Sequence, residues 1–403
     1  MRLHRNLVFA VIDSLHLIFN ENKYADKVIT STLKRDKRWG ARDRAFVAET
    51  TYEIVRWKRL YSEIAEVKNH YSRENLFKVF CVWAVLRGIS LPDWKQFYNT
   101  PARKIKGRFD ELTKIRKFKE SIPDWMDNLG ASALGEAVWN QEIKALNTQA
   151  PVVLRTNFLK TTPKKLQQIL MDEDVETEIL KKYPSALQLT ERKNVFKTTA
   201  FKNGLFEVQD ASSQLVAPIL EVKPGMRVID TCAGAGGKTL HLAALSENKG
   251  QIIALDIYQN KLNELKRRAR RAGAHNIETR TIESTKDIKK LYNKADRVLI
   301  DAPCSGMGIL RRNPDAKWKL QPEFIQNIED TQRDILASYS KMLKPNGKLV
   351  YATCSILPSE NEKQVEFFLT SEQGKDFKLE KESKILSHKS GYDGFYMALL
   401  SKK

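Results

Sequence analysis

The chain has 403 residues, which is enough for two or three domains and a sizeable core. Its 42% hydrophobic and 29% charged residues are ordinary globular usage, and they argue against a largely disordered chain and a membrane-embedded body. The 69 Lys and Arg exceed the 49 Asp and Glu, and the net charge of +20 favours phosphate backbones or anionic lipid heads as partners.

Only four cysteines occur, and they are far apart in the sequence: Cys81, Cys232, Cys304 and Cys354. They form no Cys-x-x-Cys pair and have no His at metal-ligand spacing, so neither a disulfide framework nor a structural zinc site is predicted. We therefore expect a cytoplasmic protein that binds no metal. No apolar run reaches the roughly 18 residues of a spanning helix, so we expect no membrane partner.

Residues 1–140 are predicted to form a helical domain. An apolar face at helical spacing predicts its first helix, with Leu7, Val11, Leu15 and Ile18 along one side. Asp13 and His16 interrupt the apolar run, which favours an amphipathic helix over a secretion signal. Further helices are predicted over residues 43–61 and 75–86.

Positive charge is concentrated in this helical part of the chain. Residues 1–120 hold 26 Lys and Arg against 14 Asp and Glu. Two basic clusters, residues 34–44 and 103–119, each include an aromatic side chain. Each cluster is interpreted either as a nucleic-acid contact that neutralises phosphates or as a solvated helix face.

Residues 145–210 predict a small α+β connecting subdomain. Residues 152–158 are a strand candidate, and Thr162-Pro163 marks the start of a helix that continues through residues 164–170.

Residues 211–403 predict a catalytic domain of the doubly wound α/β class. Four apolar runs each end in a polar or reactive residue and are separated by helical lengths: residues 227–230, 251–256, 296–301 and 347–354. This alternation is typical of a Rossmann-like sheet, whose ligands bind at the carboxyl ends of the parallel strands.

A glycine-rich turn, residues 230–239 (DTCAGAGGKT), follows the first of these strands. It does not match the GxxxxGK[ST] template, because Cys232 stands where the first glycine is required. It does not match the GxGxxG template either, because Thr239 stands where the last glycine is required. Asp256 ends the second strand, where a carboxylate can accept both ribose hydroxyls of an adenosine, the alternative being a plain turn residue. The turn therefore favours an adenosyl cofactor that lacks a pyrophosphate.

Cys304 lies just after the third predicted strand and Cys354 ends the fourth, so both lie on the ligand-binding edge. The runs CAGAGGKT, DAPCSGMGILRRNPDAKW and YATCSILPSENE resemble the Fmu/Sun family of S-adenosylmethionine-dependent RNA cytosine-C5 methyltransferases, which includes bacterial 16S rRNA enzymes. Residues 201–215 and 391–400 resemble the flanks of the family's catalytic domain. The 43–61 helix resembles its NusB-like RNA-binding domain.

The resemblance implies an enzyme that methylates C5 of a cytosine in RNA, with 16S rRNA as the favoured substrate and S-adenosylmethionine as cofactor. A tRNA cytosine-C5 methyltransferase is one alternative. A non-catalytic RNA-binding factor for ribosome assembly is another. We expect a monomer.

Methylation of cytosine C5 has a use for two cysteines, one before and one after methyl transfer. Cytosine C5 becomes nucleophilic when a thiolate adds at C6, and the C5 proton must later be removed with help from a second group. The resemblance implies that Cys354 is the nucleophile and that Cys304 assists release. DNA cytosine methyltransferases instead use the cysteine of a Pro-Cys motif, which is Cys304 here, and the residues alone do not separate the two assignments.

The resemblance also implies roles for Asp301, which would hold the N3/N4 edge of the cytosine, and for Lys238, which would stabilise a thiolate or contact the base. Glu283 is the nearest match to an acidic residue that contacts adenine in the family, where Asp is usual. Cys232 is expected only to pack in the turn. The full predicted cofactor site comprises Cys232, Ala233, Gly234, Ala235, Gly236, Gly237, Lys238, Asp256, Glu283 and Asp301.

A base in a duplex is unreachable, so the RNA must present its cytosine single-stranded or flipped out. Four residues directly after the Cys304 motif are predicted to contact that RNA through phosphates and one stacking face: Arg311, Arg312, Lys317 and Trp318.

Overall fold

The computed structural model describes residues 2–68 and 70–403, and the chain divides into two compact units. The first unit is Met1–Thr148 together with Leu310–Pro322, and the second is Gln149–Ile309 together with Glu323–Lys403. Within the described residues, no helix is both long and apolar enough to cross a bilayer.

The first unit is helical. Its helices are α1 (Arg5–Phe19), α2 (Ala25–Arg35), α3 (Ala41–Arg56), α4 (Lys58–Ile64), α5 (Arg73–Leu86), α6 (Ala102–Leu112), α7 (Arg116–Lys119), α8 (Asp124–Leu134), α9 (Glu136–Leu146) and α17 (Ala316–Lys319).

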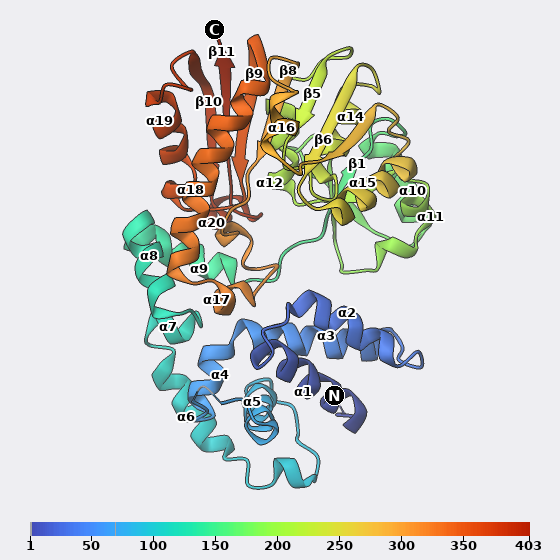
Figure 1. Cartoon of the computed structure of the whole chain (residues 1–403). Coiled ribbons are helices and arrows are strands. Elements are labelled where there is room, and N and C mark those ends of the chain that lie inside the picture. The colour runs from blue at the N-terminus through green and yellow to red at the C-terminus, as the bar shows by residue number, and fades with distance from the viewer. Residues whose placement is uncertain (1, 69) are drawn as a thin grey trace. The chain divides into compact units, whose positions relative to one another are not determined.

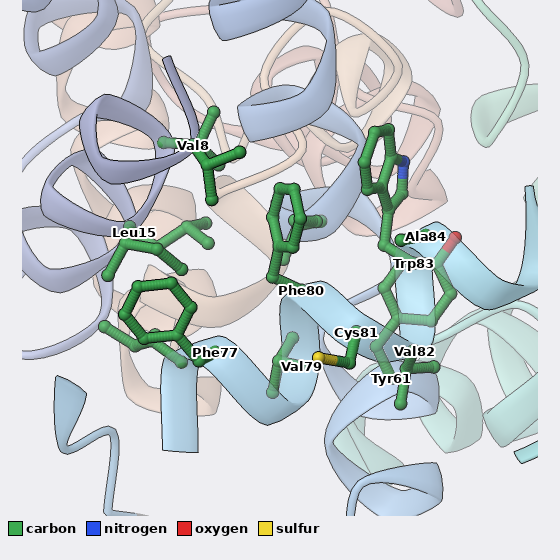
Figure 2. Close-up of a cluster of buried hydrophobic side chains, with 14 of the residues drawn as sticks. Val8, Leu15, Tyr61, Phe77, Val79, Phe80, Cys81, Val82, Trp83 and Ala84 are labelled. Carbon is green, nitrogen blue, oxygen red and sulfur yellow. The ribbon is translucent and has the colours of Figure 1, made fainter. Parts of the chain in front are cut away.

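The core of the first unit gathers around α1 and α5. The predicted apolar face of α1 is buried as expected, since Leu7, Val11, Leu15 and Ile18 are all at most 5% exposed. Figure 2 shows Val8 and Leu15 of α1 in the same cluster as Phe77 and Phe80 of α5. The Ser72 side chain accepts a hydrogen bond from the Asn75 N–H and so caps the start of α5.

The single helix predicted over residues 43–61 is wrong, because the chain changes direction at Trp57, between α3 and α4. The backbone groups freed at this break are satisfied from elsewhere in the unit. The Trp318 indole N–H donates to the Val55 carbonyl at 2.7 Å, and the Arg59 N–H donates to the Ser121 hydroxyl at 3.0 Å. Long-range partners therefore replace helical hydrogen bonds, which apolar periodicity does not reveal.

The second unit begins with a small four-stranded antiparallel sheet in the order β2-β3-β1-β4. Its strands are β1 (Val153–Thr156), β2 (Thr177–Ile179), β3 (Ala186–Leu189) and β4 (Phe206–Val208), with helices α10 (Pro163–Asp172) and α11 (Thr199–Lys202). As predicted, Thr162 caps α10 and Pro163 occupies its first turn.

The rest of the second unit is a seven-stranded sheet in the order β10-β11-β9-β8-β5-β6-β7 (Figure 1). Its strands are β5 (Arg227–Asp230), β6 (Gln251–Asp256), β7 (Ile277–Thr281), β8 (Ala295–Asp301), β9 (Leu343–Thr353), β10 (Phe377–Ile385) and β11 (Phe395–Lys402). Its helices are α12 (Ala211–Gln214), α13 (Val216–Ile219), α14 (Gly237–Leu245), α15 (Gln259–Ala272), α16 (Thr285–Lys289), α18 (Pro322–Tyr339), α19 (Glu362–Thr370) and α20 (Ser387–Ser390).

Strands β5 to β9 are parallel, and β11 is antiparallel to both β9 and β10. Alternate residues of each central strand pack on opposite faces: Val228 lies with α13, α14 and α15, whereas Ile229 lies with α16, α18 and α19. Burial on both faces explains why these strands are continuous apolar runs in the sequence. The doubly wound α/β fold expected from the sequence is confirmed.

Candidate active site

The glycine-rich turn after β5 packs closely against α15, and at Gly236 no space is left for a side chain. Gly234 and Gly236 have φ values of 54° and 88°, which favour glycine. A Cβ on Gly236 would lie 2.5 Å from the Leu265 side chain of α15. The turn then leads directly into α14, so free backbone N–H groups of a helix start face the carboxyl edge of the sheet.

Asp256, at the end of β6, holds this turn in place. Its Oδ2 accepts a hydrogen bond from the Gly234 N–H at 2.9 Å, and its Oδ1 accepts one from the Tyr258 N–H at 2.8 Å. Each carboxylate oxygen has a second lone pair, so two further hydroxyl groups can still be bound. The residue thus shapes the turn, as the alternative interpretation expects, and keeps the acceptors that a ribose needs.

Asp230, which the sequence patterns did not single out, is fully buried at the end of β5. The Thr239 hydroxyl donates to its Oδ2 at 2.7 Å, while its Oδ1 has no hydrogen-bond partner among the described residues. Burial raises the pKa of Asp230 to about 7. A buried acceptor beside the turn fits a site that receives a polar ligand group.

Arginines of the small sheet and of α15 hydrogen-bond the backbone of the glycine-rich turn. Arg155 of β1 donates to the Gly237 carbonyl, and Arg268 of α15 donates to the Ala235 carbonyl at 2.8 Å. Glu207 of β4, 4% exposed, pairs with Arg268 at 2.9 Å and with Arg271 at 2.5 Å. Two arginines of α15 therefore pair with a buried carboxylate, and one of them, Arg268, also binds the turn. The sequence does not reveal this role, because Glu207 lies 61 and 64 residues away from the two arginines.

Lys238, in the first turn of α14, reaches Asp301 at the end of β8. Its ammonium donates to Asp301 Oδ2 at 2.7 Å and lies 5.1 Å from the centre of the Phe395 ring. The Lys238 and Asp301 side chains are 11% and 29% exposed, so the pair is partly accessible. The structure thus brings together two predicted site residues, one from the start of α14 and one from the end of β8.

The two cysteines also meet at this edge. Cys304 Sγ and Cys354 Sγ lie 3.2 Å apart, at the ends of the neighbouring strands β8 and β9, and both cysteines are free. The adjoining Cys354 sulfur and burial together raise the pKa of Cys304 well above its ordinary value. The Cys304 sulfur thus tends to keep its proton and to hydrogen-bond its neighbour.

Glu360, a residue of the PSENE run to which the sequence assigned no role, bridges the two cysteine loops. It is fully buried and accepts hydrogen bonds from the Ser305 N–H at 2.7 Å and from the Ser305 and Ser355 hydroxyls at 2.5 Å each. Gln332 of α18 donates to it at 3.1 Å. Because Ser305 and Ser355 directly follow the cysteines, this carboxylate fixes the distance between the two sulfurs.

Two glycines allow the loops to approach. The Gly308 N–H donates to the Cys354 carbonyl at 2.9 Å, and the Gly394 N–H donates to the Gly308 carbonyl at 2.8 Å. A Cβ on Gly308 would lie 2.3 Å from the Gly394 carbonyl oxygen. The backbone that precedes β11 is therefore packed directly against the cysteine loops.

Other predicted cofactor residues are placed less centrally. Glu283 follows β7 and its side chain is exposed, so the structure puts it at the far end of the edge. Cys232 packs against the core of the sheet, and burial raises the pKa of its thiol. Ala233 is buried in the turn, where its N–H donates to the Leu255 carbonyl at 2.8 Å.

The prediction that Lys317 contacts RNA is wrong. Its side chain is 1% exposed, and its ammonium donates to the carbonyls of Arg56 and Ser121, both at 2.8 Å. These acceptors fill the positions that a phosphate would need. Trp318 packs against the core of the same unit and Arg311 is only 3% exposed, whereas Arg312 is half-buried and stays a predicted contact.

The chain matches the family model of the 16S rRNA methyltransferase RsmB/F over residues 217–401, and that of the RsmF/B-like ferredoxin-like domain over residues 122–196. The probable ribosomal RNA small subunit methyltransferase B of Synechocystis is 34% identical over 298 residues, which cover 70% of this chain and 67% of that protein.

Two solved structures share the fold. The crystal structure of PH0851 superimposes with a TM-score of 0.83 at 25% identity and covers 100% of both chains. NSun6 from Pyrococcus horikoshii, solved with SFG, superimposes with a TM-score of 0.65 at 23% identity and covers 70% of this chain and 99% of that one.

The family match, together with the seven-stranded Rossmann-like sheet and its glycine-rich turn, identifies the chain as a methyltransferase that uses S-adenosylmethionine. The 34% identity to the Synechocystis protein, over 67% of its length, assigns the chain to one family within this class. The chain belongs to the RsmB/F family of 16S rRNA methyltransferases, and it methylates rRNA.

Proposed function

We propose that the protein transfers a methyl group to C5 of a cytosine in 16S rRNA through a covalent adduct with the RNA. The observation that carries this proposal is the 3.2 Å separation of Cys304 Sγ and Cys354 Sγ on the ligand-binding edge. A nucleophile and an assisting group within contact distance of one base are what this chemistry needs.

In the proposed reaction the Cys354 thiolate forms a bond to cytosine C6, which makes C5 nucleophilic. S-adenosylmethionine supplies the electrophilic methyl group that C5 takes up. The C5–H bond then breaks with help from Cys304, and its proton passes to the solvent. The electron pair of that bond restores the C5–C6 double bond, and Cys354 leaves C6 as a thiolate. The contact between the two sulfurs supports this pairing of roles, because both can reach the same base, and the assignment of Cys354 as the nucleophile follows the family resemblance.

Asp301 and Lys238 are assigned to the base. Asp301, which pairs with Lys238 at 2.7 Å, ends β8 only three residues before Cys304. We assign Asp301 to the N3/N4 edge of the cytosine, where a carboxyl group can hydrogen-bond as N3 becomes protonated. Lys238 keeps Asp301 oriented and adds positive charge near the thiolate.

The cofactor is assigned to the turn. The residues Cys232, Ala233, Gly234, Ala235, Gly236, Gly237 and Lys238 would surround its amino-acid end, with Asp256 on the ribose and Glu283 toward the adenine. The buried Oδ1 of Asp230, unpartnered among the described residues, supports a ligand at this turn. The backbone N–H groups at the start of α14 supply further donors.

Bisulfite sequencing of total RNA, from cells with and without the gene, tests the proposed function. We expect one cytosine of 16S rRNA to lose its protection when the gene is removed. Loss of protection in a tRNA would show that the substrate is tRNA and not 16S rRNA. The absence of any changed cytosine would contradict C5 methylation.

A further inference from the structure

A hollow of about 390 Å³ lies in the second unit, away from the glycine-rich turn. One wall is the connection between β2 and β3, residues 180–183. The other wall is formed by the end of β10 and by α20 and the residues after it, up to Tyr392. The small sheet and the large sheet thus each contribute a wall, and Figure 1 shows α20 below β10 and β9.

Four lysines line this hollow, which we call the lysine hollow: Lys181, Lys182, Lys384 and Lys389. Lys181, Lys182 and Lys389 are exposed, whereas the Lys384 side chain is 29% exposed. Lys384 pairs with Glu362 at 2.9 Å, but among residues 2–68 and 70–403 no carboxylate lies within ion-pair distance of the other three. Three cations around one concavity, each outside ion-pair distance of every described carboxylate, favour a polyanion as ligand.

Two tyrosines complete the hollow. The Tyr183 and Tyr392 rings meet edge to face with their centres 5.1 Å apart. The Tyr392 hydroxyl donates to the Gln188 side chain of β3 at 2.9 Å, which fixes its ring. An ordered aromatic surface among lysines suits the stacking of a nucleobase whose phosphates lie on the cations.

The position of the lysine hollow relates it to the cysteine pair. Ile385 at the end of β10 pairs with Phe395, and the next residue of β11, Tyr396, pairs with Thr353 directly before Cys354. The hollow therefore lies at the same edge of the sheet as Cys354, on the β10 side. The glycine-rich turn and Asp256 lie on the opposite side of the cysteines, after β5 and β6.

We propose that the lysine hollow binds the single-stranded RNA that flanks the target cytosine, with phosphates on Lys181, Lys182 and Lys389 and a base against the tyrosines. This inference rests on the proposed function, because it places the target base at Cys354. Because the cofactor is assigned to the side of β5 and β6, the RNA would extend from the target cytosine in the other direction, past the ends of β9, β11 and β10.

The test is a triple charge reversal, Lys181→Glu, Lys182→Glu and Lys389→Glu, in the full chain. Its control reverses three exposed lysines at the opposite, amino edge of the large sheet, Lys294, Lys341 and Lys378, and so changes the net charge equally. Affinity for a short single-stranded RNA of mixed sequence is measured by fluorescence anisotropy over a range of salt concentrations, and S-adenosylmethionine affinity by calorimetry.

We expect the hollow variant to bind RNA at least about tenfold more weakly than the control variant, with a salt slope lowered by roughly 0.7 for each phosphate that is no longer neutralised. S-adenosylmethionine affinity stays unchanged in both. Equal RNA affinities of the two variants would overturn the inference, because the effect would then be one of net charge alone.

A second variant, Tyr183→Ala, keeps every charge. We expect it to raise the KM for RNA with little change in kcat, and an unchanged KM would remove the stacking part of the proposal. The binding measurements need no methyl transfer. If bisulfite sequencing contradicted C5 methylation, the lysine hollow would still stand or fall on RNA affinity.

Discussion

At the residue scale, the Asp256 carboxylate has a structural role in the glycine-rich turn and a proposed role in binding the cofactor. Its oxygens already accept the N–H groups of Gly234 and Tyr258, which shapes the turn, and they retain lone pairs for a ligand. Its burial, with 7% of the residue exposed, makes any further hydrogen bond a strong one because water competes poorly there.

We predict that Asp256→Ala weakens S-adenosylmethionine binding at least about tenfold, since a hydrogen bond to a charged group contributes roughly 1.5–3 kcal/mol. Calorimetry measures the affinity. Asp296→Ala is the matched control, because Asp296 also accepts a backbone N–H, that of Arg227 at 2.8 Å, but lies at the amino edge of the sheet. Equal affinities of the two variants would remove Asp256 from the cofactor site.

The sequence was informative about residues that follow a buried strand directly. Asp256, Asp301, Cys304 and Cys354 could be selected because each comes within three residues of the end of an apolar run. Asp230 ends such a run too, but its unpartnered oxygen depends on side-chain packing. Glu360 could not be found, because its function consists of contacts to Ser305, which lies 55 residues away.

At the scale of elements, Glu360 links the loops after β8 and β9. Its carboxylate is surrounded by donors: the Ser305 N–H, the Ser305 and Ser355 hydroxyls and the Gln332 amide. An ionised carboxylate accepts four hydrogen bonds, whereas a glutamine side chain has only one acceptor oxygen. Replacement of this carboxylate by an amide would therefore remove acceptors that link the two loops.

We predict that Glu360→Gln lowers kcat by roughly a hundredfold, because small displacements of reacting groups have effects of that order. The KM for RNA and the S-adenosylmethionine affinity should change little, and Glu360→Asp should restore part of the activity. The alkylation rate of Cys354 by iodoacetamide reports the loop geometry independently of turnover. Normal kcat in a folded Glu360→Gln enzyme would refute the positioning role.

Among the elements, buried parallel strands were the easiest to predict. The strands expected over residues 227–230 and 251–256 coincide with β5 and β6, because burial on both faces leaves only apolar residues between two turns. The helix expected over residues 43–61 divides at Trp57, because its backbone is hydrogen-bonded by Trp318 and Ser121. Such long-range substitution leaves no local pattern.

At the scale of the whole molecule, residues 310–322 leave the catalytic unit shortly after Cys304 and join the core of the helical unit. Lys317 is the centre of this insertion, with its ammonium on the Arg56 and Ser121 carbonyls and on the Asn147 side chain at 3.0 Å. The segment that continues the Cys304 motif is therefore held in place by residues that lie between positions 56 and 147.

We predict that Lys317→Met destabilises the protein by roughly 2–4 kcal/mol, because it leaves buried acceptors without a donor. The free energy of unfolding is measured with urea, and Lys114→Met, at an exposed lysine of the same unit, is the control. Equal stability of the two variants would show that the buried ammonium is dispensable.

The same insertion couples the basic clusters of the helical unit to its stability. Deleting residues 1–140 would remove phosphate-binding candidates and, with them, the partners of Lys317 and Trp318. We therefore expect such a deletion to lower both the RNA affinity and the stability of the protein. Neutralisation of exposed cations such as Lys37 and Lys106 in the full chain isolates the electrostatic contribution.

The most direct test of the proposed mechanism separates the two cysteines, because their roles lie on opposite sides of methyl transfer. Cys354→Ala and Cys304→Ala are each incubated with substrate RNA and S-adenosylmethionine, denatured, and examined by electrophoresis for a nuclease-sensitive band of retarded mobility. We predict this covalent species with Cys304→Ala, which attacks but releases slowly, and its absence with Cys354→Ala. The reverse pattern would make Cys304 the nucleophile, and a band with neither variant would contradict covalent catalysis by this pair.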